Sequence, residues 1–218
     1  MHGKWYDDAC GTAFALEVIG ERWSLLVVRE LLLGPRRFTD LRAGLPGISA
    51  KVLTERLESL ERAGVLVRRQ MPPPTAAQVY ELTDWGYLAE EPVKALGAWA
   101  AASPRHDPTL PLSAASLMIS FRTMFDAARA QDCRVVAALV VGGEDFTVAV
   151  HDGKLEARRG RPDHPDCTLS APSAEPVAAA VYGKVPFAQL AYAGLAVTGD
   201  MGAAARVVDL FHLPAKVI

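Results

Sequence analysis

Apolar residues recur at helical spacing through the first hundred residues of the chain. That spacing, with the glycines and prolines between segments, predicts helices over residues 11–19, 23–33, 40–45, 50–63 and 83–102. In the fourth of these helices the apolar positions form one narrow stripe of Leu53, Leu57 and Leu60. A helix held by so narrow a stripe leaves most of its circumference free to contact a partner.

Local signals mark the ends of several of these helices. Thr39 is the expected N-cap of the short third helix, which ends before Pro46-Gly47, and Ser49 is the expected N-cap of the fourth. Gly64 fits the position just beyond the fourth helix, where a left-handed backbone is common. In the last helix, Pro92 predicts a kink or a break.

Two segments rich in β-branched and aromatic residues, VLVRRQ at 65–70 and QVYEL at 78–82, flank the loop MPPPTAA and predict a β-hairpin. Between residues 36 and 69 the chain carries eight basic and four acidic residues, a local charge of +4, although its overall net charge is -2. Two short helices joined by a Leu-Pro-Gly turn and followed by a basic hairpin are typical of a winged helix-turn-helix, whose second helix enters the major groove of DNA.

The candidate DNA contacts are residues at the start and on the outward face of this second helix, with the arginines that flank the two helices. They are Arg36, Arg37, Ser49, Ala50, Lys51, Thr54, Glu55, Arg56, Arg68 and Arg69. A carboxylate repels phosphates, so we expect Glu55 either to accept a hydrogen bond from a cytosine amino group or to pair with a neighbouring basic side chain.

Several motifs in this half of the chain resemble the HxlR-type winged-helix transcriptional regulators. They are the cysteine before the first helix, VIGERW, LLLGPRRFTDL, LPGISAKVLTERLESLERAG and ELTDWG, and the resemblance spans nearly all of residues 8–102. It implies a homodimer that binds double-stranded operator DNA as a repressor or an activator, with repression expected here. The family's wing usually carries Pro-Pro and then a basic residue, whereas residues 72–77 are PPPTAA, which leaves Arg68 and Arg69 at the base of the wing to meet phosphates.

Cys10 has two interpretations. Some HxlR-type regulators sense oxidants through a cysteine at this position, and a thiol at a helix N-terminus, with Lys4 nearby in the sequence, gains thiolate character. Cys10 is therefore a candidate redox site. Alternatively, it packs in the dimer interface as a small hydrophobic side chain while a separate domain does the sensing.

The segment SPRHDPTLPL, residues 103–112, is dense in proline and predicts a boundary between a domain of residues 1–104 and one of residues 113–218. Beyond it we expect a helix over residues 113–130, then short strands, then further helices. The strands are predicted at residues 134–141, 145–153, 154–159 and 166–171, and the helices at residues 174–182, 186–193 and 202–211. The predicted fold class is α+β, a winged helix followed by a sheet packed with helices.

The order of these later elements, with a DG turn, PDCTLS and GLAVTGD, is similar to that of sterol-carrier-protein-like domains over about the last 80 residues. The resemblance implies a sheet covered by helices, with an apolar tunnel between the layers that binds a lipid or another small apolar ligand. Candidate walls of this pocket are Leu117, Phe121, Phe125, Phe146, Leu190, Tyr192 and Phe211. Without a tunnel, each of these is an ordinary core residue.

The composition, 50% hydrophobic and 22% charged over 218 residues, is that of a globular protein. No apolar run approaches the roughly 20 residues that span a bilayer, so we expect a cytoplasmic protein with no membrane partner. The cysteines Cys10, Cys133 and Cys167 are widely spaced and the histidines isolated, so no metal and no cofactor are expected. No nucleophile elbow, phosphate loop or dinucleotide fingerprint is present, which argues against an enzyme.

Together these features predict a one-component regulator whose operator affinity responds to a small hydrophobic ligand in the second domain. One alternative is a regulator that senses oxidants through Cys10 and has a purely structural second domain. Another is a lipid carrier or enzyme with an accessory winged helix. Co-purification of a small apolar molecule would separate the first hypothesis from the second, and turnover assays would separate the third from both.

Overall fold

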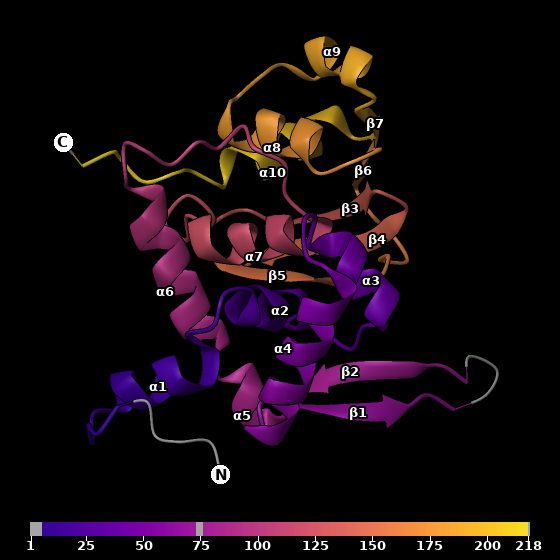
Figure 1. Ribbon diagram of the computed structural model, residues 1–218. Coiled ribbons are helices and arrows are strands. Elements are labelled where there is room, and N and C mark those ends of the chain that lie inside the picture. The colour runs from indigo at the N-terminus through magenta and orange to yellow at the C-terminus, as the bar shows by residue number, and fades with distance from the viewer. Residues whose placement is uncertain (1–5, 73–75, 218) are drawn as a thin grey trace. The chain divides into compact units, whose positions relative to one another are not determined.

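The computed structural model describes residues 6–72 and 76–217, drawn in colour in Figure 1. The chain forms two compact units, residues 1–93 and 94–218, called here the N-terminal and C-terminal units. The middle of the predicted wing loop, residues 73–75, and Lys4 beside Cys10 lie outside the described residues.

The N-terminal unit is mostly helical. Its elements are α1 (Gly11–Ile19), α2 (Ser24–Leu31), α3 (Phe38–Gly44), α4 (Ala50–Arg62), β1 (Leu66–Gln70), β2 (Gln78–Leu82) and α5 (Asp84–Tyr87). The third helix begins at Phe38, two residues earlier than predicted, because Arg37 rather than Thr39 occupies the N-cap position. The carboxylate of Asp40 accepts a hydrogen bond from the Arg37 backbone N–H at 3.3 Å, and this contact replaces the expected hydroxyl cap.

Helix α4 has the predicted caps and the predicted buried stripe. The Ser49 hydroxyl accepts a hydrogen bond from the backbone N–H of Val52 at 3.2 Å, and Gly64 has a left-handed backbone with φ of +76°. The stripe residues Leu53, Leu57 and Leu60 are buried as α4 packs on α2 and β1. Local caps and a short apolar stripe therefore suffice to define this helix.

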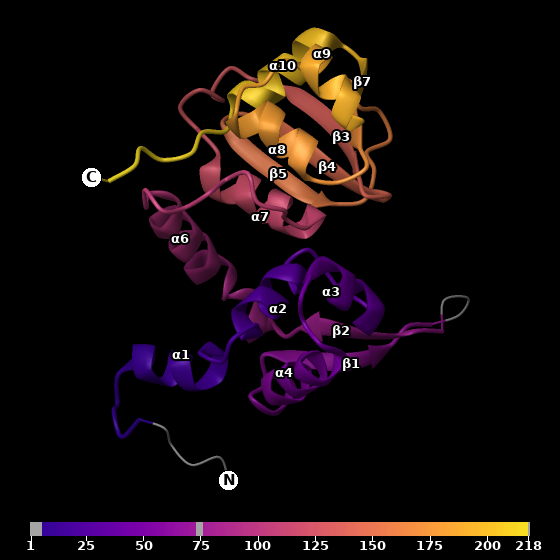
Figure 2. The ribbon, with the colours of Figure 1, turned by 45° about the horizontal axis from the view of Figure 1, so that its top comes forward.

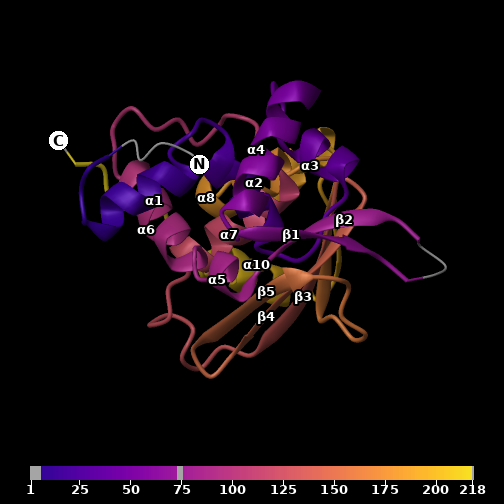
Figure 3. The same ribbon diagram turned by 60° about the horizontal axis from the view of Figure 1, so that its bottom comes forward.

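Strands β1 and β2 pair antiparallel from Leu66 opposite Leu82 to Gln70 opposite Gln78, as predicted. Figures 1 and 3 show this hairpin projecting from the helices of the N-terminal unit. Arg36 forms an isolated β-bridge with Tyr80, because the two residues exchange backbone hydrogen bonds of 2.9 and 2.8 Å. This bridge fixes the segment before α3 to the base of the hairpin.

The helix predicted over residues 83–102 is interrupted. Helix α5 ends at Tyr87, and α6 (Glu90–Ala101) begins three residues later, so the break lies at residues 88–89 and not at Pro92. Pro92 lies instead in the first turn of α6, where the N–H that proline lacks has no acceptor within the helix.

The C-terminal unit contains one five-stranded mixed sheet with helices packed on it (Figure 2). Its elements are the part of α6 from Lys94 onward, α7 (Ala114–Met124), β3 (Val135–Val141), β4 (Glu144–His151), β5 (Lys154–Arg159), β6 (Cys167–Ala171), α8 (Glu175–Tyr182), α9 (Phe187–Leu190), a 3-10 turn (Ala191–Ala193), β7 (Ala196–Gly199) and α10 (Met201–Asp209). The strand order is β5-β4-β3-β6-β7, with β3 and β6 parallel and the other pairs antiparallel.

The core of the C-terminal unit lies between the sheet and helices α7, α8 and α10. The rings of Phe121 and Phe211 stack at a centroid separation of 4.4 Å. The α+β architecture predicted for this half is confirmed, including strand β5 with its predicted bounds. Predicted helix 113–130 is shorter, because it ends at Met124 and Phe125 has an extended backbone.

The two units divide inside α6, between Val93 and Lys94, so the proline-rich segment predicted as the boundary, residues 103–112, lies inside the C-terminal unit. The end of α6 belongs to that unit because the chain's C-terminal segment binds it. The Lys216 ammonium donates to the carbonyl oxygens of Ala101 and Ser103 at 2.9 and 3.1 Å, and the Val217 N–H donates to the Ala102 carbonyl. A cation at the C-terminal end of a helix also complements its dipole.

Candidate nucleic-acid interface

Helices α3 and α4 are joined by a tight turn over residues 45–49. The backbone N–H of Ile48 donates to the Leu45 carbonyl at 3.1 Å, and Gly47 has φ of +90°, a conformation that favours glycine. Both Leu45 and Ile48 are buried. The turn therefore fixes the angle between the two helices and leaves the first turn of α4 exposed.

The exposed face of α4 begins at its N-terminus, where Ser49, Ala50 and Lys51 are all exposed. Thr54 and Glu55 follow on the same helix and are also exposed, with the Thr54 hydroxyl donating to the Ala50 carbonyl at 3.0 Å. The structure thus brings together five of the predicted contacts on one helical surface. This surface carries donors and acceptors of the kind that recognise base edges.

Arg56, also predicted to contact DNA, occupies a different position. Its side chain is only 18% exposed, and its guanidinium lies 3.3 Å from the Glu21 carboxylate, with Glu55 at 3.9 Å. Arg56 therefore ties α4 to the residues before α2, and it partly neutralises Glu55. The sequence did not reveal this partner, because Glu21 lies 35 positions away.

The arginines of the hairpin are exposed and paired. Arg68 lies 2.8 Å from the Glu61 carboxylate, which raises its pKa further, and its guanidinium lies over the Tyr80 ring at 5.9 Å. Arg69 lies 2.9 Å from the Glu81 carboxylate. These contacts orient both cations along the hairpin, where they can exchange a carboxylate for a phosphate.

Of the two arginines before α3, Arg37 is exposed and Arg36 half-buried. The backbone bridge to β2 holds them close to the hairpin base. The predicted basic residues therefore come from three segments of one unit: the approach to α3, the start of α4 and strand β1.

Two further residues support this surface, although sequence analysis did not select them. The buried Glu30 carboxylate, 1% exposed, pairs with Arg29 at 2.8 Å and lies so close to Gly44 that a Cβ there would be 2.6 Å from it. Trp23, with φ of +81°, extends its ring toward Gly47 in the turn, where an added Cβ would lie 3.9 Å from the ring. The glycines of the motif LRAGLPG were the available signal of such close approach.

Cys10 is exposed at the N-cap position of α1. The backbone N–H and the hydroxyl of Thr12, and the backbone N–H of Ala13, lower the pKa of its thiol, although the thiol makes no capping hydrogen bond. The other described cysteines differ, because burial raises the pKa of Cys167 to about 11 and Cys133 is half-buried.

Large apolar side chains are exposed on the helices outside the helix-turn-helix. In the N-terminal unit these are Tyr6, Phe14, Leu16, Leu26, Trp85 and Leu88. The rings of Phe14 on α1 and Trp85 on α5 stack at 6.5 Å. Helix α6 adds Leu96 and Trp99, the latter 76% exposed. Exposed aromatic groups of this kind are typical of surfaces that bind another protein.

None of the seven residues predicted to line a ligand pocket is among the lining residues of the pocket described in the next paragraph. Leu117, Phe121, Phe146 and Phe211 are fully buried in the core, whereas Phe125 and Leu190 are half-buried. The prediction for Tyr192 is wrong in this arrangement, because the 3-10 turn after α9 leaves its side chain 100% exposed.

A pocket of about 170 Å³ does lie in the C-terminal unit, but with a different lining. The lining residues are Ala180, Lys184, Val185, Pro186, Phe187, Ala205, Val208 and Asp209.

Within the described part of the chain, no group of three or more histidine, cysteine or acidic side chains is arranged to hold a metal ion. Nor does any helix among the described residues have the length and apolarity that crossing a membrane requires.

A helix-turn-helix followed by a basic two-stranded wing defines the N-terminal unit as a winged-helix DNA-binding domain. A family profile described as HxlR-like helix-turn-helix matches residues 18–107. The chain belongs to this family of transcriptional regulators.

The relatives show how much of the chain the family covers. The uncharacterized HTH-type transcriptional regulator YvaP of Bacillus subtilis is 39% identical over 87 residues, which are 39% of this chain and 80% of YvaP. The HTH-type transcriptional regulator YodB of the same species is 34% identical over 86 residues, 39% of this chain and 77% of YodB. The solved structure of reduced YodB is 30% identical and covers 46% of this chain and 100% of YodB, with a TM-score of 0.41. Structures of diamide-treated and quinone-bound YodB are also similar to this chain.

The family profile ends at residue 107, before the sheet of the C-terminal unit. The resemblance of that unit to sterol-carrier-like domains stays a prediction.

Proposed function

We propose that this protein is a homodimeric regulator that binds operator DNA with α4 in the major groove and the β1–β2 hairpin as a wing. The observation that carries the proposal is the division of α4 into two faces. Leu53, Leu57 and Leu60 anchor one face in the core, while Lys51 and Thr54 stand exposed on the other. A helix so anchored can present side chains to base edges without exposing its core.

The proposed contacts divide into two kinds. Ser49, Ala50, Lys51, Thr54 and Glu55 are proposed to meet the bases or the phosphates at the groove edge, because they surround the first turns of α4. The arginines of the approach and the hairpin, Arg36, Arg37, Arg68 and Arg69, are proposed to meet phosphates. Phosphate contacts give affinity without sequence information, whereas base contacts give sequence preference.

Dimerisation is supported by the apolar residues exposed in each unit, such as Phe14 and Trp85 in the N-terminal unit and Trp99 on α6. One helix-turn-helix reads only a few base pairs, so two copies are needed for a specific site. We expect two recognition helices about 34 Å apart, one turn of DNA. A dimer bound at an operator blocks access to the promoter, so repression is the proposed sign of regulation.

The experiment that tests this proposal selects binding sequences from random duplex DNA with the full chain, then measures variants on the selected site and on a scrambled one. Lys51→Ala should lower the preference between the two by roughly 1 to 3 kcal/mol. Arg68→Gln should weaken binding to both alike and reduce the slope of log affinity against log salt concentration by about 1. Arg105→Gln, an exposed arginine of the C-terminal unit, is the matched control. No selected sequence, or Lys51→Ala with unchanged preference and affinity, would refute the assignment of α4.

We further propose that a small, mainly apolar ligand in the C-terminal unit changes operator affinity. The pocket lined by Lys184 and Asp209 supports a binding site there, although not at the residues first predicted. A ligand can act on DNA affinity only if it binds the DNA-competent and incompetent arrangements with different strengths. Operator affinity with and without bound ligand measures this difference directly.

A second candidate function, regulation by oxidants, is favoured by the exposed Cys10 with its lowered pKa. Thiolates react with oxidants and electrophiles, and the relative YodB has been solved in reduced, diamide-treated and quinone-bound forms. Diamide should then lower the operator affinity of the wild type but not that of Cys10→Ser. Equal responses of both proteins would eliminate Cys10 as the sensor.

A further inference from the structure

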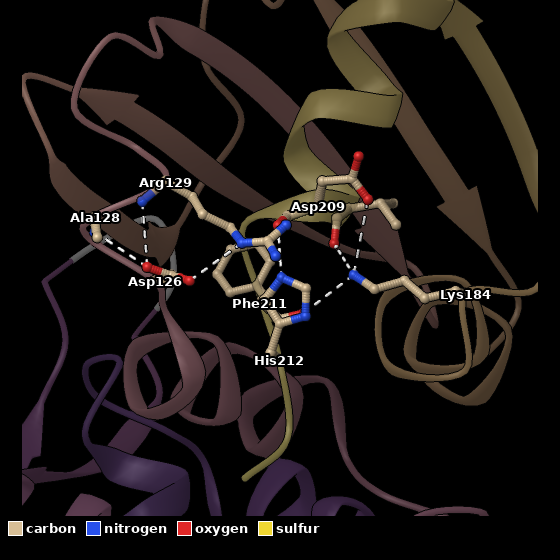
Figure 4. A network of polar contacts seen from close by, with 8 residues as sticks. Asp126, Ala128, Arg129, Lys184, Asp209, Phe211 and His212 are labelled. Atoms are coloured by element: carbon tan, nitrogen blue, oxygen red, sulfur yellow. Dashed lines mark hydrogen bonds and ion pairs between the residues drawn. The ribbon is translucent and has the colours of Figure 1, made fainter. Parts of the chain in front are cut away.

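The pocket of the C-terminal unit is bounded by α8, by the segment that leads into α9, and by the C-terminal half of α10. Most of its walls are apolar, among them Ala180, Phe187 and Val208, while Lys184 and Asp209 supply its charges. Figure 4 shows the Lys184 side chain extended toward Asp209 and the backbone at the end of α10. The pocket therefore combines an apolar floor with one anchored ammonium group.

The position of this ammonium is set by backbone geometry. Lys184 has φ of +52°, an uncommon conformation for a residue with a side chain, and its Nζ lies 2.7 Å from the Val208 carbonyl oxygen and 3.2 Å from that of Phe211. These two hydrogen bonds leave the third N–H of the ammonium. Asp209 Oδ1, at 3.9 Å, is within ion-pair range but beyond a hydrogen bond.

The charged groups near the Lys184 ammonium are Asp209 and Arg129, and the Lys184 side chain is itself 38% exposed. Burial lowers the pKa of Lys184, and the positive charge of Arg129 lowers it further, whereas Asp209 opposes both effects. Arg129 is itself paired with Asp126, at 3.3 Å, and the side chain of Asp209 is 69% exposed, so solvent screens its charge. The ring of His212, which carries no negative charge, contacts the backbone carbonyl oxygen of Asp209 at 2.9 Å. Because two of the Lys184 N–H groups donate to backbone carbonyls and the side chain is partly exposed, the third N–H can donate to a ligand carboxylate.

We propose that this pocket binds a small monocarboxylate whose apolar part is about the size of a benzene ring. A cavity of about 150 Å³ accommodates benzene, and the pocket measures about 170 Å³. The carboxylate accepts a hydrogen bond from Lys184, while the ring or chain lies against Ala180, Phe187 and Ala205. The inference rests on the proposed ligand response, because it supplies the site and the chemical class of that ligand.

The site adjoins the segment that binds the end of α6. Phe211, which accepts from Lys184, is followed by His212, whose N–H donates to the Met124 carbonyl at 3.2 Å. The same segment continues to Lys216, which holds the Ala101 carbonyl. A carboxylate bound to the third N–H of Lys184 therefore lies next to the first residue of this segment.

Isothermal titration of the full chain with hexanoate, benzoate and hexanol, without DNA, tests the pocket. We expect saturable binding of both carboxylates. Hexanol should bind at least about tenfold more weakly than hexanoate, because hexanol lacks the charge-assisted hydrogen bond. Lys184→Met should reduce hexanoate affinity about tenfold or more, whereas Lys154→Met, an exposed lysine on β5, should not. No saturable binding of either carboxylate, or equal affinity for hexanol, would overturn the proposal.

A second variant covers the case in which Lys184→Met unfolds the end of α10. Ala205 lines the pocket and is exposed, so Ala205→Phe fills the space without removing a contact of Lys184. It should abolish hexanoate binding while leaving the melting temperature of the unliganded chain within a few degrees of wild type. Unchanged hexanoate affinity in Ala205→Phe would place the ligand elsewhere. If Ala205→Phe loses hexanoate binding, the pocket is confirmed. If hexanoate bound to the wild type then leaves operator affinity unchanged, the ligand response is removed from the proposed function.

Discussion

Gly86 in α5 lies against Val65, which follows α4, and against Leu82 of β2, and its replacement by alanine should destabilise the N-terminal unit. An added Cβ would lie 2.1 Å from the Val65 carbonyl oxygen and 3.2 Å from the Leu82 Cβ. Neither neighbour can easily yield. The Val65 carbonyl already accepts the backbone N–H of Thr83 at 3.0 Å, and the Thr83 hydroxyl donates to the Gly64 carbonyl at 2.7 Å and accepts from the Gly86 N–H at 3.0 Å.

The size of the effect follows from that overlap. Ordinary contact at a Cβ begins at 3.4 Å, so the backbone segments must separate by about 1 Å or the new side chain must strain. Overpacking costs about 1 to 3 kcal/mol, and a weakened hydrogen bond at Val65 adds about 1 kcal/mol. For a unit of about 90 residues, a loss of 2 to 4 kcal/mol corresponds to a fall in melting temperature of roughly 8 to 20 °C.

Guanidinium unfolding followed by tryptophan fluorescence is the suitable assay, because Trp5, Trp23 and Trp85 all precede the unit boundary. Gly11→Ala is the matched control. A Cβ at Gly11 meets nothing within 4 Å, and the position opens a helix. If Gly86→Ala unfolds within about 0.5 kcal/mol of both wild type and this control, the junction tolerates a side chain and the argument from close approach is wrong.

Three other changes test separate features. Phe14→Ser should shift the mass measured by light scattering from dimer toward monomer, because it removes an exposed ring that stacks on its neighbour, whereas Leu110→Ser should leave the mass unchanged. Iodoacetamide should label Cys10 with a midpoint below the ordinary cysteine pKa, because the N–H donors favour the thiolate, and should leave Cys167 unlabelled in the folded chain; equal pH profiles would contradict this. Lys216→Met should increase the hydrogen-exchange rate of the Val217 amide, because the Lys216 side chain holds the segment against the end of α6. An unchanged rate would show that this amide is protected without the Lys216 side chain.

Features set by residues close together in the chain were predictable. Helix α4 was found because its cap at Ser49, its stripe of leucines and Gly64 all lie within 16 consecutive residues. The interruption between α5 and α6 was misplaced because proline is a strong local signal. In the structure the break comes earlier, directly after the four residues of α5. These residues pack against β2 and include Gly86, where an added Cβ would overlap the Val65 carbonyl oxygen.

Features set by distant partners were not predictable from local patterns. Arg56 was predicted to contact DNA, yet its guanidinium is held by Glu21, 35 positions away in the sequence. The ligand pocket shows the same limit in another form. Sequence analysis assigned its walls to large aromatic residues such as Phe121 and Phe211, but large side chains fill space and stack on each other. The pocket lies instead where α8 and α10 carry the small residues Ala180 and Ala205.

The boundary between the two units lies inside helix α6. Proline density identifies where regular structure stops, at residues 103–112, but the contacts of the C-terminal unit extend back to Lys94 because Lys216 and Val217 bind the last turn of α6. Helix α6 is therefore continuous across the boundary, with residues 90–93 in one unit and the rest in the other. Helix α6 thus begins in the N-terminal unit, and its last turn is bound by the segment that follows Phe211 in the C-terminal unit.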